Sequence, residues 1–188
     1  YQMMSIHDGQ MGSYVDLQGK RYRDKLHIYD GKWNHTWGQD IGSNKWIKNK
    51  KNQLDVRKRL RNVFNYWQNN GVTSETFLYT THKEYQKTVH PDKVSGLSNR
   101  LNDDYGDSDK RECMEDKDRR NVCFLSQTIR GTNDFNHKKF MAFTCNTFLD
   151  PQLDRFLKYH DVPIDEESYA LNRMIQWLWR GCIRNEQE

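Results

Sequence analysis

The chain has 188 residues, which is enough for one domain with an elaborated end and too few for two full-sized domains. Only 35% of the residues are hydrophobic and 30% are charged, a balance that would favour disorder if 24 aromatic residues did not supply bulk for a core. The 3 Pro and 11 Gly exclude collagen-like and linker-dominated chains, and no apolar run approaches the roughly 18 residues of a membrane span. We therefore expect a globular protein that does not bind a membrane. Its net charge of +4 mildly favours an anionic partner.

The cysteines and the chain ends bear on the compartment. Four cysteines occur without any C-x-x-C spacing, and the last three, Cys123, Cys145 and Cys182, fall within apolar runs that favour buried, reduced thiols. This pattern, together with the lack of a secretion signal at Tyr1, predicts a cytoplasmic location. A chain that begins at Tyr1 and stops just after a helical pattern is also expected to be part of a longer protein.

Three elements are predicted in the first half. Residues 1–50 combine Gly, Trp, Tyr and Asn with short alternating stretches, so we expect a small β-rich, basic and aromatic extension. Residues 52–68 place apolar side chains at helical spacing among several Arg and Lys residues, which predicts a basic amphipathic helix. Residues 76–81 form a compact β-favouring run that suits a buried strand.

The second half predicts more strands and helices. Residues 95–121 are almost wholly polar and are expected to form a charged insertion, after which apolar runs at 122–125 and 140–145 predict two buried strands. Helices are predicted from Pro151 to about residue 159, and again after Asp165. Because strands alternate with helices, residues 51–188 are expected to form one α/β domain.

The last predicted helix has two contrasting faces. Gln176, Arg180 and Arg184 fall on one side, at four-residue spacing. The opposite side is an apolar stripe of Leu171, Met174, Ile175, Leu178, Trp179 and Cys182. The basic face could be solvated, or it could bind phosphate through the planar, permanently charged guanidinium groups.

Four motifs in this order resemble a known family. The loop S-Q-T-I-R-G-T-N-D (126–134), the strand F-M-A-F-T-C and the helix Q-W-L-W-R-G-C-I-R are similar to motifs V and VI of superfamily 2 helicases of the phage and plasmid replication type. The segment T-F-L-Y-T-T-H-K-E (76–84) resembles motif IV, so the similarity runs from about residue 52 to 184. It implies the second, C-terminal RecA-like domain: three layers around a mostly parallel sheet.

The resemblance also implies roles for individual residues. Arg180 and Arg184 would be catalytic by reaching the γ-phosphate of ATP, with Mg²⁺ and ATP held mainly by the N-terminal motor domain of the same protein. The other nucleotide-contacting residues would be Gln176, Asn133, Arg130 and Gly131. Contacts to the backbone of a nucleic acid, expected to be DNA, would come from Thr81, His82, Lys83, Ser126 and Thr132. No metal ligand is expected in this chain.

The chain departs from the helicase pattern at three points. Arg180 and Arg184 are four residues apart instead of three, and Asn133 occupies the position of the usual motif V aspartate, with Asp134 following it. No G-x-x-x-x-G-K-[ST] phosphate loop and no acidic magnesium-binding strand motif occurs, so the chain alone is not expected to hydrolyse ATP.

Two non-enzymatic functions compete with this interpretation. His90-Pro91-Asp92, preceded by a lysine-containing segment, resembles the tripeptide of J-domain co-chaperones, which would require a helical hairpin with these residues at its tip; it could equally be a simple turn. Trp33, Trp37 and Trp46 alternate with lysines, a mixture that can stack bases and bind phosphates in a plain nucleic-acid-binding domain, or that can pack in a small sheet.

Overall fold

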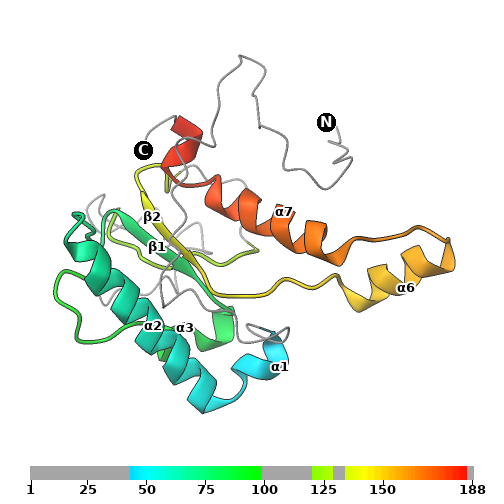
Figure 1. The fold of residues 1–188 in the computed structure, drawn as a ribbon, viewed down its shortest axis with the longest axis horizontal. Coiled ribbons are helices and arrows are strands. Elements are labelled where there is room, and N and C mark those ends of the chain that lie inside the picture. Colours follow the sequence, from blue (N-terminus) through cyan, green and yellow to red (C-terminus); the bar gives the residue numbers. More distant parts are fainter. Residues whose placement is uncertain (1–42, 99–119, 129–133, 186–188) are drawn as a thin grey trace, which may run out of the picture.

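The computed structural model describes residues 43–98, 120–128 and 134–185, and Figure 1 shows their arrangement. The elements in chain order are α1 (Asn44–Ile47), α2 (Lys50–Gln68), β1 (Phe77–Thr80), the 3-10 helix η2 (Lys83–Tyr85), α3 (Gln86–Val89), β2 (Phe140–Phe143), α6 (Pro151–Tyr159), α7 (Glu166–Leu178) and the 3-10 helix η3 (Cys182–Asn185). The predicted helices and the strands at 76–81 and 140–145 are confirmed, with ends shifted by a few residues. The last helix is the exception: α7 ends at Leu178, so Arg180 and Arg184 are not part of it.

The strands β1 and β2 form a parallel sheet, and β1 has a neighbouring segment along each of its two edges. Phe77 of β1 pairs with Phe140 of β2, in parallel register. On the other edge of β1 the backbone makes one parallel bridge, between Tyr79 and Phe124, so residues 122–125 run alongside β1 without forming the full strand that the sequence predicts. The sheet of the described residues therefore has two strands, and the three extended segments end at one common edge.

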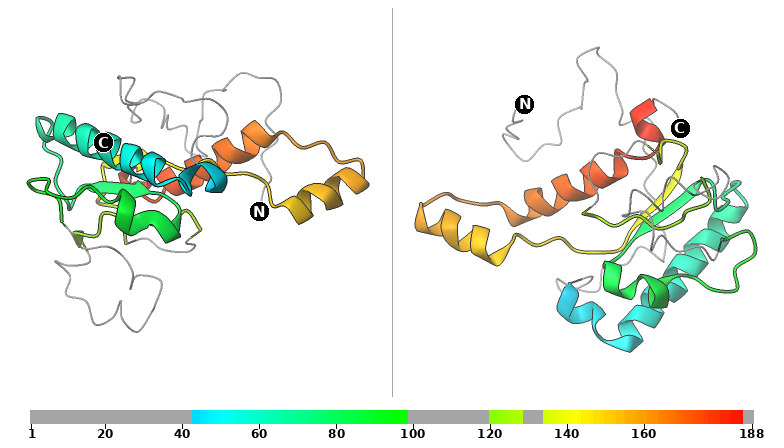
Figure 2. Two further views of the ribbon diagram at one scale, coloured as in Figure 1. Left: turned by 90° about the horizontal axis from the view of Figure 1, so that it is seen from below. Right: turned by 180° about the vertical axis from the view of Figure 1, so that it is seen from behind.

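Helix α2 covers one face of the sheet. Asn49 caps the helix by accepting a hydrogen bond from the Lys51 backbone N–H (2.9 Å). The buried residues of α2 meet the aromatic side of β1, where the rings of Phe64 and Phe77 lie edge to face with centroids 5.1 Å apart. This main core contains Ile47, Val56, Leu60, Phe64, Val72, Phe77, Tyr79, Val89, Leu97, Cys123 and Phe124. Figure 2 shows α2 lying along the sheet in two further views.

Helix α7 packs on a second core through Trp177. Leu78 alternates with Phe77 and Tyr79 along β1, so it faces away from α2, and it packs with Trp177 in a cluster distinct from the main core. The indole Nε1–H of Trp177 donates to the Leu125 carbonyl (3.2 Å). The cluster also contains Val122, Leu125 and Phe135. Helices thus cover both faces of the small sheet, while α6 projects away from it (Figure 1).

The buried side of α7 differs from the predicted apolar stripe. Trp177 is 1% exposed, whereas Leu171 of the predicted stripe is 37% exposed. Arg173, within α7, and Arg180, in the turn after α7, are both half-buried. The expectation that Arg180 continues an exposed helix face opposite the packed side is therefore wrong, because α7 ends at Leu178 and Arg180 lies in the turn that follows.

Part of each predicted peripheral segment belongs to the main core. Residues 1–42 of the predicted extension and 99–119 of the predicted insertion lie outside the described residues. Residues 43–50 are largely helical instead of β-rich: Ser43 caps α1, and Ile47 is fully buried against α2. Likewise Leu97 is buried, and the Gly96 carbonyl accepts a hydrogen bond from the Ser74 hydroxyl (2.8 Å). Because Ile47 and Leu97 are buried, the predicted extension ends before residue 43 instead of at residue 50, and the predicted insertion begins after residue 98 instead of at residue 95.

The co-chaperone alternative is wrong, because His90 is part of the core. Its ring is 5% exposed and lies between the Tyr79 hydroxyl and the Ser98 carbonyl, 3.0 Å from each. Since a carbonyl only accepts, Nε2 carries the proton and Tyr79 donates to Nδ1; burial lowers the pKa of this histidine. Asp92 forms an ion pair with Arg57. The tripeptide is a packed turn after the single-turn helix α3, and residues 83–98 contain no helical hairpin that presents it.

A buried lysine lies directly before β2. Lys138 is fully buried, and its ammonium donates to the carbonyls of Ser74 and Arg120, each at 2.8 Å. Burial lowers the pKa of Lys138 to about 8. The lysine thus connects the segments before β1, before residues 122–125 and before β2, at the amino end of the sheet. Because it is buried there, its cationic form is less favourable in free energy than it would be in water.

The protein should therefore gain stability from Lys138 as the pH rises from about 8 to 10. In this range the unfolded lysine keeps its proton while the folded one releases it, so deprotonation favours the folded state. One pKa unit corresponds to about 1.4 kcal/mol, and we expect wild type to gain on the order of 2 to 3 kcal/mol relative to Lys138→Met. Urea unfolding of both proteins at several pH values measures this difference; a constant difference would contradict the lowered pKa.

Candidate functional site

Polar residues meet where the three parallel segments end. Thr80 and Thr81 lie at the end of β1, Ser126 follows residues 122–125, and Thr144 follows β2. The Thr144 hydroxyl donates to the Thr80 carbonyl at 2.6 Å. In open α/β sheets ligands bind outside the carboxyl ends of the strands, so this edge is the first candidate for a binding surface.

The loops beyond this edge are joined by side-chain hydrogen bonds. Thr147, which follows β2, donates to the side-chain carbonyl of Gln127 (3.1 Å). The hydroxyls of Ser126 and Thr128 are 2.9 Å apart. These contacts fix the loop that leaves residues 122–125 against the loop that leaves β2. Sequence reasoning missed them, although hydroxyl and amide residues directly after each strand are a signal for such an edge.

Thr81 offers a buried hydroxyl without a partner. Its side chain is fully buried, and its Oγ1 has no hydrogen-bond partner within the described ranges. The neighbouring Thr80 hydroxyl likewise has no hydrogen-bond partner in these ranges, but it lies beside the Cys145 thiol, whose pKa burial raises to about 12. A buried polar atom left unpaired costs on the order of 1–3 kcal/mol, so a ligand that pairs with Thr81 would recover that cost. His82, half-buried, and Lys83, exposed, continue the chain from this point.

Arg180 is a partly buried cation with an unpaired nitrogen. Its Nη1 is buried and has no hydrogen-bond partner among the residues that the structure describes. Burial, followed by the charge of nearby Arg173, lowers the pKa of this guanidinium, which nevertheless stays protonated. A buried cation without a counter-charge is unfavourable. The site is therefore suited to an anion that approaches from outside the described part of the chain.

The predicted site residues fall into two groups. The Cys182 N–H donates to the carbonyl of Lys138 (3.0 Å), so the end of α7 lies beside the start of β2, at the opposite edge from Thr81. Gln176 is exposed one turn before Arg180, and Arg184 lies in η3. The other group, at the carboxyl edge, contains Thr81, His82, Lys83 and Ser126. Arg130, Gly131, Thr132 and Asn133 lie outside the described residues.

One residue connects the two groups. Trp177 lies in the last turn of α7, three residues before Arg180, and its indole donates to Leu125, the residue directly before Ser126. A shift of α7 would therefore act directly on the segment that ends at the polar edge. The sequence did not indicate this contact, because the pattern around Trp177 and Trp179 does not show which indole is buried or what accepts its hydrogen bond.

The described segments hold no obvious metal site. No group of three or more His, Cys, Asp or Glu side chains comes together within residues 43–98, 120–128 and 134–185. Cys123, Cys145 and Cys182 are free and buried, which confirms the sequence interpretation for these three. In the same ranges no helix combines the length and the apolar character of a membrane span.

Comparison with known proteins places the chain in a family. Residues 20–188 match the family described as the YonV C-terminal Rossmann-like domain. The chain is 31% identical over 170 residues to the SPbeta prophage-derived protein YonV of Bacillus subtilis (strain 168), and the match covers 88% of this chain and 34% of that protein. The chain thus spans about a third of this relative's length. No solved structure matches. The chain belongs to the YonV C-terminal Rossmann-like domain family.

Proposed function

We propose that this Rossmann-like domain is the C-terminal motor domain, in the RecA-like version of the fold, of an ATP-dependent nucleic-acid helicase or translocase. The observation that carries the proposal is Arg180, a partly buried guanidinium whose buried Nη1 has no hydrogen-bond partner among the described residues and is therefore suited to an anion. The phosphoryl group of a nucleotide carries such a charge, and its transfer is accelerated by an arginine supplied from a neighbouring domain.

The segment around Arg180 fits this role. Gln176 lies in the last turn of α7, Arg180 in the turn that follows it and Arg184 in η3, in the order of the motif VI-like sequence. ATP with Mg²⁺ supplies the transferable γ-phosphoryl group and would be held mainly by another domain of the protein. Arg180 would bind the γ-phosphate oxygens through its planar fork, and Gln176 would help to position it.

The carboxyl edge of the sheet fits a nucleic-acid backbone. The hydroxyls of Thr81 and Ser126 are hydrogen-bond donors of the kind that bind phosphate oxygens, and the exposed Lys83 adds a positive charge. Both hydroxyl residues are buried, so these contacts would require the loops at this edge to open. Contacts to phosphate and sugar carry no sequence information, so little base specificity is expected, and DNA is the expected substrate.

Coupling between the two sites would pass through Trp177. Pairing of Arg180 with the γ-phosphate would pull α7 toward the other motor domain, and release of phosphate would let it return. Because the Trp177 indole is bonded to Leu125, each movement would change the position of Ser126 at the nucleic-acid edge. This alternation of backbone contacts is the basis of the proposed translocation.

Thr81→Val tests the nucleic-acid edge. Valine replaces an unpaired buried hydroxyl by a methyl group, so the free energy of unfolding should rise by about 1 kcal/mol. At the same time, binding of a fluorescent 20-nucleotide single strand should weaken about tenfold or less, the size of one lost hydrogen bond.

Thr80→Val is the matched control, since this neighbouring threonine is equally buried and its hydroxyl is also unpaired among the described residues, but that hydroxyl lies beside the Cys145 thiol. It should leave oligonucleotide affinity unchanged. Equal affinities of wild type and Thr81→Val would remove Thr81 from the proposed interface.

A further inference from the structure

A basic groove runs between α2 and the turn that follows α3. It is an open hollow of about 450 Å³. Its lining consists of Leu54, Arg57, Lys58 and Arg61 from α2, and Asp92 and Lys93 from the turn. We propose that this groove binds the sugar-phosphate backbone of a nucleic-acid strand, as a contact surface separate from the carboxyl edge of the sheet.

The second wall of the groove is fixed by hydrogen bonds. Lys50, at the start of α2, donates to the Thr88 hydroxyl (3.4 Å), and Gln68, at the helix end, donates to the Ser95 carbonyl (2.7 Å). His90 anchors the turn in the core through Tyr79 and Ser98. The residues between Thr88 and Ser95 therefore run beside α2, and the hollow between them spans Leu54 to Arg61, about 10 Å of helix at 1.5 Å per residue. A linear ligand is suited to such a track.

The charge of the groove is strongly unbalanced. Asp92 is its single acidic lining residue and is paired with Arg57, which lowers the pKa of this carboxyl group. Lys58, Arg61 and Lys93 make no ion pair within the described part of the chain. Three unpaired cations along an open track, with the Arg57 guanidinium beside them, are complementary to a row of phosphates.

The position of the charges on α2 explains why they are available. The opposite side of the helix is buried against the sheet through Val56, Leu60 and Phe64. Lys58 and Arg61 are exposed, three residues apart, and Leu54 between them and the helix start is 46% exposed, so an apolar sugar could rest on it. The hollow offers no deep apolar pocket for anchoring side chains of an acidic protein, which favours a nucleic-acid backbone.

The groove shares no residue with Arg180 or the carboxyl edge, so binding there does not depend on the motor proposal.

Lys58→Gln/Arg61→Gln should weaken binding of a labelled single-stranded 20-mer, without ATP, at least about tenfold at low salt. The slope of log Kd against log salt should fall by about 1.4, since each phosphate contact on a single strand contributes about 0.7. Asp92→Asn should tighten binding, because it removes the groove's carboxylate.

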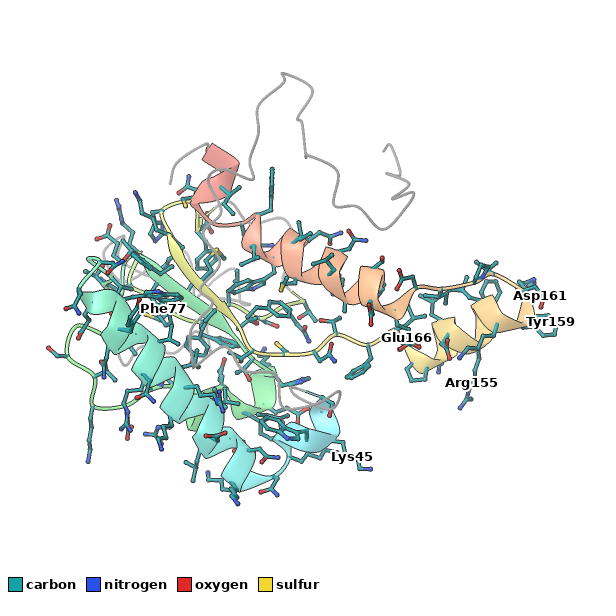
Figure 3. All side chains as sticks on the ribbon, in the orientation of Figure 1. Lys45, Phe77, Arg155, Tyr159, Asp161 and Glu166 are labelled. Carbon is teal, nitrogen blue, oxygen red and sulfur yellow. The ribbon has the colours of Figure 1, made fainter. Side chains whose placement is uncertain are left out.

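Arg155→Gln/Lys158→Gln is the control with the same change in net charge, on the projecting helix α6, where Figure 3 shows Arg155 pointing away from the molecule. It should change affinity less than twofold. Circular dichroism would establish that all variants fold. Unchanged affinity of the folded groove variant, or an equal loss in the α6 control, would overturn the proposal that the groove binds a nucleic acid. If the groove variant of the complete protein still hydrolysed ATP, the motor proposal would be unaffected.

Discussion

Arg180→Met should lower the turnover of ATP by the complete protein roughly 10³- to 10⁵-fold, the usual range for an arginine that contacts a transferring phosphoryl group. Methionine keeps much of the aliphatic length but removes the charge whose burial lowers the pKa of Arg180. The free energy of unfolding should therefore stay the same or increase. A large loss of kcat without a loss of stability distinguishes a functional arginine from a structural one.

Arg155→Met is the control for charge alone. Arg155 is exposed on α6, so its loss should change turnover and stability very little. Arg180→Lys should recover only part of the activity, because an ammonium cannot form the bidentate fork. If Arg180→Met turned over ATP at a near-normal rate, Arg180 would only be a partly buried surface charge.

Trp177→Ala should destabilise the protein by about 3 to 5 kcal/mol. The indole is 1% exposed, packs edge to face against Phe143 (centroids 5.7 Å apart), and fills the core between α7 and the sheet. Its loss would also leave the Leu125 carbonyl without the indole donor. Urea unfolding measures the change.

Tyr159→Ala is the matched aromatic control, because Tyr159 is 83% exposed at the end of α6 (Figure 3). Its effect should stay within about 0.5 kcal/mol. If Trp177→Ala were as mild as this control, the packing of α7 on the sheet would have to be rejected.

The elements of the fold were predictable where local patterns and burial agree. The helical spacing around Leu60 and Phe64 and the apolar run at 140–145 coincide with α2 and β2. The pattern did not predict the environment of Trp177, because a helical wheel groups side chains by hydrophobicity alone and contains no hydrogen-bond acceptor. Nor could it show that Ile47 and His90 enter the core, since both lie in mostly polar stretches and are buried by contacts with distant segments.

The candidate site was only partly accessible from the sequence. Thr81 and Ser126 could be placed at one edge because the carboxyl ends of parallel strands meet. The lack of a partner for the Thr81 hydroxyl within the described residues and the half-buried state of Arg180 depend on tertiary packing, which no local spacing encodes. Likewise, the basic helix was visible, but the groove requires the turn at Asp92 and Lys93 to lie beside it.

The most direct test of the motor assignment is phosphate release from ATP by the complete protein, measured with and without a saturating single-stranded oligonucleotide. We expect hydrolysis that the oligonucleotide stimulates and that requires Mg²⁺, and no hydrolysis by the 188-residue chain alone, which has no phosphate loop. If the complete protein released no phosphate above background under either condition, the assignment of this domain to an ATP-dependent motor would be contradicted.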